Sequence, residues 1–290
     1  MIIDKSIWNI DTLVLSSGGA NGVTFFGAAN LLKEYGILQN IKHYIGCSAG
    51  AITCALLACD IDPKEILEKT LYFEICDWNN NINPSEGVMK VTKLKNLLCE
   101  IIGDRTMKDV DKRLTFSTLN LSQNKTVYID TETHPDIKIV DAVIMSSSIP
   151  VVFPCVKYND DLYIDGAITD SFPIQKCADS SSTLGIYISI FNRERDLAIF
   201  NNGGISSIMC YTKLILSSVI TELEQLRNIS HYTVLDISNS QKTITNMLTI
   251  SPEQKVLFFH NGIDKTKRFI NQQYELRAMS QNDTNALLIP

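Results

Sequence analysis

Residues 43–59 read His-Tyr-Ile-Gly-Cys-Ser-Ala-Gly-Ala-Ile-Thr-Cys-Ala-Leu-Leu-Ala-Cys. The pattern predicts a short apolar strand over residues 43–46, a tight turn, and a helix over residues 49–59. The turn has the sequence G-x-S-x-G, formed by Gly46, Cys47, Ser48, Ala49 and Gly50. Between a strand and a helix, this sequence is typical of a nucleophile elbow, in which small residues flank a serine that projects from the sheet. A small-residue turn without chemistry looks the same, so Ser48 is a candidate nucleophile that needs partners elsewhere in the chain.

The length and composition are those of an ordinary globular chain. It has 290 residues, of which 45% are hydrophobic and 20% are charged, and its formal net charge is −6. The negative charge argues against nucleic acid as a partner and against a general attraction to anionic lipid. Without a repeat, low-complexity tract or linker, residues 1–290 are predicted to form a single domain, with core motifs within residues 12–175 and a C-terminal completion over residues 184–275.

The cysteines and the N-terminus predict a cytoplasmic protein. The eight cysteines form no C-x-x-C pair, which favours reduced thiols over disulfides or a metal site. Residues 1–11 carry acidic side chains where a signal peptide would have an apolar segment, and no apolar run is long enough to cross a membrane. We therefore expect a chain that is soluble or peripheral at membranes.

Alternating strands and helices at the start of the chain predict an α/β fold. A strand over residues 12–16, a glycine-rich turn over 17–22 and a helix over 23–35 precede the elbow, which implies a parallel, right-handed unit. Further strands are predicted over residues 116–121, 126–130, 162–165, 184–190 and 233–237, and further helices over 62–72, 91–102, 107–114, 139–146 and 205–227.

Three later segments carry more specific expectations. Residues 78–87 are rich in Asn, Pro, Ser and Gly and are predicted to be a loop, a candidate for membrane contact. Residues 252–273 are predicted to be a helix pair interrupted near Gly262. The helix over residues 205–227 has an apolar stripe that is predicted to be core. This stripe consists of Ile208, Tyr211, Leu214, Ile215, Val219, Leu223 and Leu226.

The glycine-rich turn reads Ser17-Gly18-Gly19-Ala20-Asn21-Gly22. It lacks the Gly-Lys-Ser/Thr of a Walker A loop, and Ser17 stands where a dinucleotide fingerprint needs glycine, so nucleotide binding is the weakest hypothesis. Such a turn can instead present bare backbone N–H groups to a transient oxyanion.

A serine hydroxyl needs a base to become a nucleophile. The histidines are His43, His134, His231 and His260, and none lies in a recognisable motif. An esterase of the α/β-hydrolase type, with the order Ser, Asp, His, could combine Asp165 or Asp236 with His260. Asp165 is the stronger candidate, because it ends a predicted strand and is followed by two small residues that permit close approach.

Four blocks in this order resemble the patatin-like phospholipases, which are lipid acyl hydrolases with a Ser–Asp dyad. They are residues 15–22 (the glycine-rich turn), 46–50 (the elbow), 146–154 (Ser-Ser-Ser-Ile-Pro followed by Phe-Pro) and 163–167 (Tyr-Ile-Asp-Gly-Ala). Together they cover residues 15–167, and residues from 251 onward are similar only weakly. The resemblance implies an α/β fold with three α/β/α layers and a mostly parallel central sheet.

The resemblance also implies roles for individual residues. Ser48 would be the nucleophile, Asp165 with its neighbours Gly166 and Ala167 would supply the base, and no metal or other cofactor would be needed. The backbone N–H groups of Gly18, Gly19 and Ala20 would form the oxyanion hole. Two departures affect this loop, since the family usually has Gly at the position of Ser17 and Arg or Lys at that of Asn21, and altered or reduced activity is expected from them.

The implied activity is that of a phospholipase A-type lipid acyl hydrolase acting through an acyl-Ser48 intermediate. Membrane lipid would be the partner, with peripheral membrane contact, while a protein activator, the oligomeric state, the head group and the acyl position stay open. The alternatives are the esterase with a Ser-Asp-His triad and a low-activity, degenerate member that binds lipid. For Asp165 to act near neutral pH, burial must raise its pKa.

Overall fold

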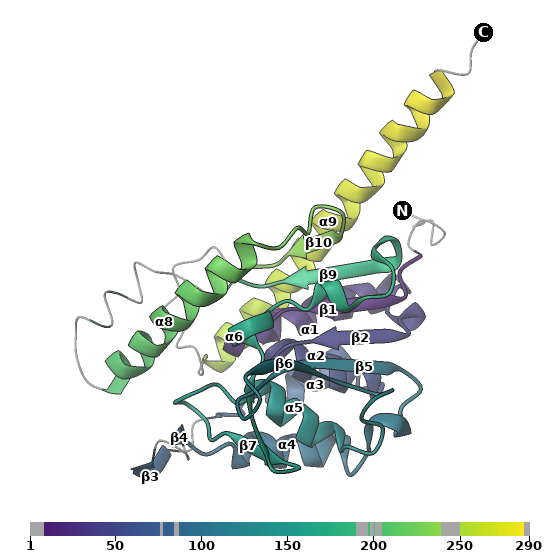
Figure 1. Ribbon diagram of the computed structural model, residues 1–290. Helices are drawn as coiled ribbons and strands as arrows, with labels where there is room; N and C mark the ends of the chain where they lie inside the picture. The colour runs from purple at the N-terminus through teal and green to yellow at the C-terminus, as the bar shows by residue number, and fades with distance from the viewer. Residues whose placement is uncertain are drawn as a thin grey trace.

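One mixed sheet forms the centre of the computed structural model, which describes residues 9–75, 78–83, 87–189, 197, 200, 205–238 and 250–286 (Figure 1). In these residues, eight strands are joined in the order β10-β9-β1-β2-β5-β8-β7, and β6 also pairs with β5. The parallel strands are β1 (Thr12–Leu15), β2 (His43–Gly46), β5 (Arg113–Asn120), β9 (Thr183–Tyr187) and β10 (Thr233–Asp236). The antiparallel additions are β6 (Lys125–Asp130), β7 (Val156–Tyr158) and β8 (Asp161–Asp165).

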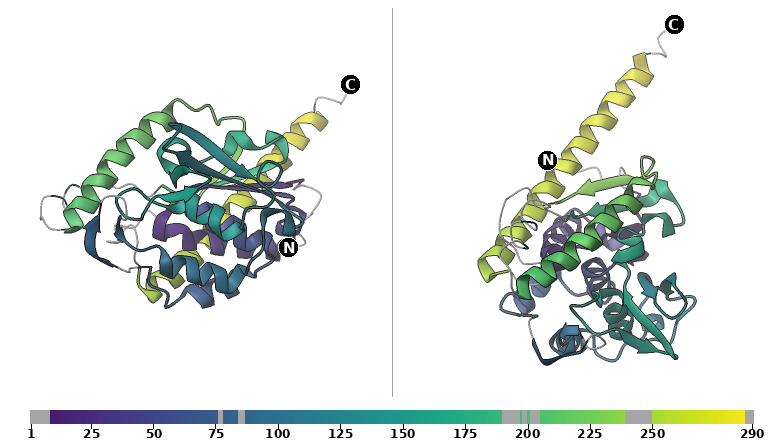
Figure 2. Two further views of the ribbon diagram at one scale, coloured as in Figure 1. Left: turned by 60° about the horizontal axis from the view of Figure 1, so that its bottom comes forward. Right: turned by 60° about the vertical axis from the view of Figure 1, so that its left-hand side comes forward.

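The central strands are buried on both faces, as their apolar sequences require. Leu13 and Leu15 of β1 pack in the larger core cluster with residues of α1 (Val23–Glu34), α2 (Ala49–Ala58) and α5 (Ile139–Ser147). Val14, between them, points to the opposite face and packs with Phe172 and Ile174. On that opposite side lie α6 (Ala167–Asp170) and α8 (Ile205–Gln225), so the fold has three α/β/α layers (Figure 2).

Most of the predicted elements are confirmed. The strands over residues 12–16 and 43–46 correspond to β1 and β2, and the predicted hairpin is the β5–β6 pair. Asp62 caps α3 (Pro63–Thr70), because its carboxylate accepts the backbone N–H of Lys64 at 2.8 Å. The helix predicted over residues 91–102 is α4 (Thr92–Ile102). The short strand β7 is not among the predicted elements.

The helix predicted over residues 107–114 is wrong. Only Met107–Asp109 form a short 3-10 turn, and Arg113 and Leu114 already belong to β5. The local signal is real, since Thr106 and Asp109 form a capping box. It is overridden because Leu114 pairs with Tyr44 in the central ladder, where its side chain is fully buried.

The loop predicted over residues 78–87 is also wrong in the part that the structure describes, and residues 84–86 lie outside it. β3 (Trp78–Asn83) and β4 (Gly87–Met89) form a separate two-stranded sheet. The backbone N–H groups of Val88 and Met89 donate to the carbonyls of Val151 and Val152, each at 2.9 Å. Val151 and Val152 are distant in the sequence, so local composition could not indicate these two hydrogen bonds.

The predicted break at Gly262 does not exist, because α9 (Pro252–Ala286) is one continuous helix. A Cβ atom at Gly262 would lie 2.2 Å from the carbonyl oxygen of Thr24, and one at Gly27 would lie 1.8 Å from that of Phe259. Both glycines therefore allow α1 and α9 to cross in close contact. Gly262 serves helix packing rather than helix termination.

The apolar stripe of α8 is not the core face that the periodicity predicts. Tyr211, Ile215 and Val219 are 54%, 47% and 43% exposed, and Leu226 is also exposed. Leu214 and Leu223 of the stripe are half-buried, and the helix is most buried along the adjacent positions that include Ile220. The side chain of Ile208 lies outside the described part. No helix among the described residues is both long and apolar enough to cross a membrane.

Candidate active site

The elbow and the glycine-rich turn leave the sheet at the same edge, because Leu15 of β1 pairs with Gly46 of β2. Ser48 adopts φ 54° and ψ −120°, a strained conformation for a residue with a side chain. The turn is so tight that a Cβ atom at Gly50 would lie 2.4 Å from the carbonyl oxygen of Leu15. One at Gly46 would lie 2.7 Å from the backbone nitrogen of Ala51. The strand, the tight turn and the helix predicted around Ser48 are therefore present, with Gly46 and Gly50 where only glycine fits.

Asp165 reaches Ser48 from the antiparallel part of the sheet. It is the last residue of β8 and pairs with Thr118 of β5. A Cβ atom at Gly166 would lie 2.3 Å from the carbonyl oxygen of Ser117, so glycine lets the chain turn against β5. The hydroxyl of Ser48 donates a hydrogen bond to Oδ2 of Asp165 at 2.7 Å. This is the geometry that a nucleophile and its base require.

The environment of Asp165 suits a base at near-neutral pH. Its other oxygen, Oδ1, accepts the backbone N–H of Ala167 at 2.8 Å and the thiol of Cys47 at 3.8 Å. Asp165 is 3% exposed and Ser48 is 5% exposed. Burial is the main cause that raises the pKa of Asp165 from its ordinary value of 3.8 to about 6, while its three hydrogen bonds act in the opposite direction. No ion pair of Asp165 with a cation occurs in the described residues.

The glycine-rich turn lies beside the elbow. Residues Gly19–Gly22 form a 3-10 turn, and a Cβ atom at Gly22 would lie 2.7 Å from that of Ala49 at the start of α2. Gly19 has φ 50°, which glycine adopts without strain. In the described residues, the backbone N–H groups of Gly18, Gly19 and Ala20 donate to no protein acceptor. They are therefore available to an anion, as the predicted oxyanion hole requires.

The two departures in this turn do not distort it. Ser17 is not among the residues with positive φ, so serine fits its conformation, and its backbone N–H donates to the carbonyl of Ser171 at 2.7 Å. The backbone N–H of Asn21 donates to the carbonyl of Gly18 at 3.0 Å and closes the turn.

A buried hydrogen-bond chain behind the elbow was not predicted. The backbone N–H of Ser48 donates to Oγ of Ser146 at 3.0 Å, and Ser146 donates to the carbonyl of Ser117 at 2.8 Å. The hydroxyl of Ser117 then donates to the carbonyl of Asp170 at 2.9 Å. Ser146 and Ser117 are fully buried, and Ser48 is 5% exposed. The triple serine at 146–148 is visible in the sequence, but only the fold shows what Ser146 holds.

The series of hydrogen bonds ends at Asp170, whose carboxylate forms an ion pair with Arg227, just beyond α8. Nη1 of Arg227 lies 2.7 Å from the carboxylate of Asp170, and Arg227 also donates to the carbonyls of Phe172 and Thr169. The hydroxyl of Tyr128 donates to the same carboxylate at 2.7 Å. Arg227 thus fixes the segment that follows Asp165, although 62 positions separate it from that residue in the sequence.

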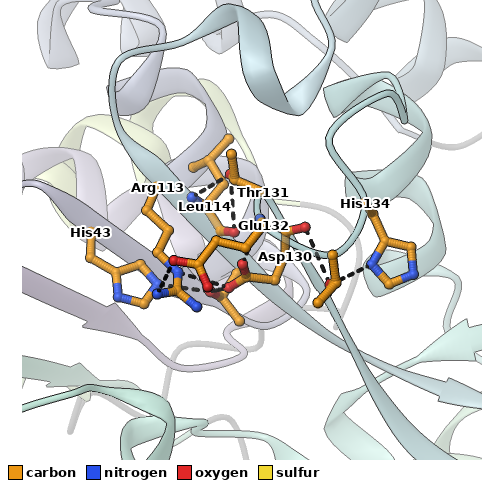
Figure 3. A network of polar contacts seen from close by, with 9 residues as sticks. His43, Arg113, Leu114, Asp130, Thr131, Glu132 and His134 are labelled. Carbon is orange, nitrogen blue, oxygen red and sulfur yellow. Dashed lines mark hydrogen bonds and ion pairs between the residues drawn. The ribbon is translucent and has the colours of Figure 1, made fainter.

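None of the four histidines takes part in the dyad. His43 begins β2, at the opposite end of that strand from the elbow, and its ring nitrogen Nε2 lies 2.7 Å from Oγ1 of Thr115 (Figure 3). His134 contacts Thr133 in the same polar region, and His231 and His260 are exposed. In the described part of the chain, no histidine hydrogen-bonds to Asp165, and no cluster of three metal-ligating side chains occurs.

Comparisons with known proteins agree with this fold. The family model of the patatin-like phospholipases matches residues 13–177, and the chain belongs to that family. A probable lipid hydrolase of Invertebrate iridescent virus 6 is 33% identical over 180 residues, which are 56% of this chain and 61% of the relative. A 1-acylglycerol-3-phosphate O-acyltransferase of Mus musculus is 25% identical over 190 residues, 63% of this chain and 45% of the relative.

A solved structure shares the fold at low sequence identity. VipD of Legionella pneumophila superposes with a TM-score of 0.57 and 18% identity, covering 91% of this chain and 67% of that one. The chain therefore spans about two thirds of the length of this neighbour and less than two thirds of the viral lipid hydrolase.

Proposed function

We propose that this member of the family is a phospholipase A-type lipid acyl hydrolase that works through an acyl-Ser48 intermediate. The observation that carries the proposal is the 2.7 Å hydrogen bond from Ser48 to a carboxylate whose pKa burial has raised to about 6. At pH 7 such a carboxylate is mostly ionised, yet it is basic enough to accept a proton.

The first step forms an acyl-enzyme. Oγ of Ser48 attacks the ester carbonyl carbon while its proton passes to Oδ2 of Asp165, which needs no histidine between them. The carbonyl oxygen becomes an oxyanion, which the N–H groups of Gly18, Gly19 and Ala20 stabilise. The tetrahedral intermediate then expels the alcohol, which takes the proton from Asp165.

The second step releases the fatty acid. Asp165 accepts a proton from water, the hydroxide attacks the acyl carbon, and the bond to Oγ of Ser48 breaks as Ser48 regains a proton from Asp165. Residues that hold Asp165, such as Ala167 through its N–H at 2.8 Å, keep the carboxylate in place through both steps.

A second candidate is acyl transfer to an alcohol instead of water. The first step would be the same, so the dyad does not distinguish the two outcomes. The low exposure of Ser48 and Asp165 favours an acceptor that arrives already bound over bulk water. One relative in the comparisons, from mouse, is named as an acyltransferase.

The test begins with a methyl fluorophosphonate probe that labels active serines and is read by intact mass. Wild-type protein is expected to gain one adduct on Ser48, and Ser48→Ala none. Phosphatidylcholine vesicles then report fatty-acid release, and added monoacylglycerol reports transfer through new diacylglycerol. If the wild type is not labelled even with vesicles present, the hydrolase proposal is wrong. The function would then be lipid binding without catalysis.

A matched control tests whether the effect of Ser48→Ala is specific to Ser48 or follows from the loss of any buried serine hydroxyl. Ser147 is 4% exposed and its hydroxyl has no hydrogen-bond partner in the described residues, so Ser147→Ala removes a buried hydroxyl of the same kind. Labelling and fatty-acid release should persist in Ser147→Ala.

A further inference from the structure

A cavity of about 440 Å³ opens beside the proposed oxyanion hole. One wall is the glycine-rich turn, through Gly19 and Ala20, and the next is Ala49, which directly follows Ser48. The cavity then extends between α1 and α2 toward residues 70–75 and the start of α9. A ligand in it would therefore have one end at the reacting atoms.

Apolar side chains line much of the cavity. Val23 and Phe26 of α1, Ile52 of α2, and Ile75 and Ile250 from the connecting segments line it. Ile52 lies one helical turn after Ser48, so the two residues share a face of the start of α2. Apolar walls of this extent take an apolar group from water.

Most polar side chains in the walls already have partners, and the exception among the described residues, Glu74, carries a carboxylate that would repel a phosphate. Nζ of Lys255 donates to the carbonyls of Thr70, Leu71 and Phe73 at 2.7 to 3.0 Å, which uses all three of its protons. The hydroxyl of Thr53 donates to the carbonyl of Ala49, and that of Ser251 to Glu253. These bonds leave no charged donor for a phosphate in the described walls, so the cavity does not suit a lipid head group.

We propose that this cavity binds the hydrocarbon chain of the acyl group while the ester carbonyl lies at the glycine-rich turn. The inference rests on the proposed function and adds to it which part of the lipid the cavity holds. At roughly 30 Å³ for each heavy atom, the 440 Å³ cavity has room for a chain of up to about fifteen carbons. Each buried methylene should increase kcat/KM about threefold to fourfold until the cavity is full.

The experiment compares two active-serine probes that differ only in chain length, methyl and decyl fluorophosphonate. In the wild type, decyl should label Ser48 at least 100-fold faster than methyl. Ile52→Trp and Ile250→Trp fill the cavity from two sides, and each should lower the decyl-to-methyl ratio at least tenfold. Ile101→Trp changes a half-buried isoleucine of α4 that does not line the cavity, and should keep the ratio.

A binding measurement tests the cavity without the chemistry. Ser48→Ala protein is titrated with dansylaminoundecanoic acid, and its fluorescence should rise on binding. Adding Ile250→Trp to this variant should weaken binding at least tenfold, whereas adding Ile101→Trp should not.

The outcomes separate this inference from the proposed function. Labelling by methyl without any advantage for decyl overturns the acyl-chain cavity and leaves the hydrolase proposal standing. No labelling by either probe, together with dansyl binding that Ile250→Trp abolishes, overturns the hydrolase and supports the cavity. No labelling and no binding overturn both.

Discussion

Asp165 and Asp130 end two different strands that both pair with β5, Asp165 opposite Thr118 and Asp130 opposite Thr115. Both carboxylates are buried, at 3% and 6% exposure. Asp165 has only hydroxyl, thiol and amide donors, and burial raises its pKa to about 6. Burial acts to raise the pKa of Asp130 too, but the hydrogen-bond donors around this second carboxylate lower it by more.

Those donors form the polar network of Figure 3. Asp130 accepts from the hydroxyl of Thr115, from the backbone N–H of Glu132 at 2.9 Å, and from Nε of Arg113 at 3.1 Å. Burial alone would raise the pKa of Asp130, but these hydrogen bonds and the guanidinium charge lower it overall. A paired carboxylate stabilises the fold, whereas an unpaired one costs stability and is a usable base. Five predictions test this difference.

The largest effect should come from removing the dyad. Ser48→Ala removes the nucleophile and should reduce kcat for fatty-acid release by on the order of 10⁶-fold, to background. Asp165→Asn keeps the shape but removes the base, and should lower kcat about 10²–10⁴-fold. Asp130→Asn is the matched control, and its kcat should stay within about threefold of wild type. A normal rate in Asp165→Asn would show that another group is the base.

The second effect is the pH dependence of catalysis. Asp165 must be ionised to accept a proton, so kcat/KM should be flat above its pKa of about 6. Below it, the rate should fall about tenfold for each pH unit. Stopped assays on vesicles between pH 4.5 and 8.5 would measure the midpoint. A midpoint near 4 would mean that Asp165 is not desolvated in the free enzyme.

The third effect tests the link from α8 to the dyad. Arg227→Gln leaves the Asp170 carboxylate without its cation, which should lower the unfolding free energy by about 2 kcal/mol. Labelling of Ser48 by methyl fluorophosphonate should slow roughly tenfold, because the segment after Asp165 loses its anchor. Arg227→Lys should recover part of that rate.

The control for this anchor is Arg268→Gln, which changes an exposed arginine of α9. Both its stability and its labelling rate should match wild type. If Arg227→Gln unfolds more easily but labels at the wild-type rate, Arg227 stabilises the fold without positioning Asp165.

The fourth effect is that Asp130→Asn and Asp165→Asn should change the unfolding free energy at pH 8 in opposite directions. The lowered pKa of Asp130 gives stability that is present above its unfolded pKa and is lost as pH falls through its folded pKa. Asp130→Asn should therefore lower the unfolding free energy at pH 8 by about 1–2 kcal/mol.

For Asp165 the sign is reversed. Its raised pKa gives stability that is complete below the unfolded value near 3.8 and is lost as pH rises through about 6. Asp165→Asn should therefore raise the unfolding free energy at pH 8 by about 1–3 kcal/mol, and by little at pH 4. Urea unfolding at the two pH values measures both variants, and equal signs would contradict the comparison.

The smallest effect concerns the histidines. Single Gln replacements of His43, His134, His231 and His260 should each leave kcat within about twofold, since none contacts the dyad. His43→Gln should cost some stability, because the ring is partly buried against Thr115; that burial, with the nearby Arg113 charge, lowers its pKa to about 4. A large loss of kcat in His260→Gln would revive the Ser-Asp-His triad.

The tight turn at Ser48 and the residues of the candidate Ser48–Asp165 pair could be predicted because they depend on local chemistry. Gly46 and Gly50 flank Ser48 in a turn that only small residues can form, and Asp165 precedes a glycine that must lie against β5. Apolar runs likewise predicted β1 and β2, since parallel central strands are buried on both faces.

The predictions that failed depend on partners distant in the sequence. Gly262 looks like a helix break until α1 packs against it, and β4 pairs with β3 while its N–H groups at Val88 and Met89 donate to the carbonyls of Val151 and Val152. The exposed stripe of α8 has helical periodicity, but periodicity does not state which face meets the body of the protein.

The sequence by itself determined the family, the nucleophile candidate and the base candidate, because each lies in a short motif whose backbone needs particular residues. Tertiary structure decided the rest: the 2.7 Å contact between Ser48 and Asp165, the burial that raises the pKa of Asp165, the anchor at Arg227 and the cavity beside Ala49. These features arise between segments far apart in the chain, and desolvation and packing exist only once those segments have come together.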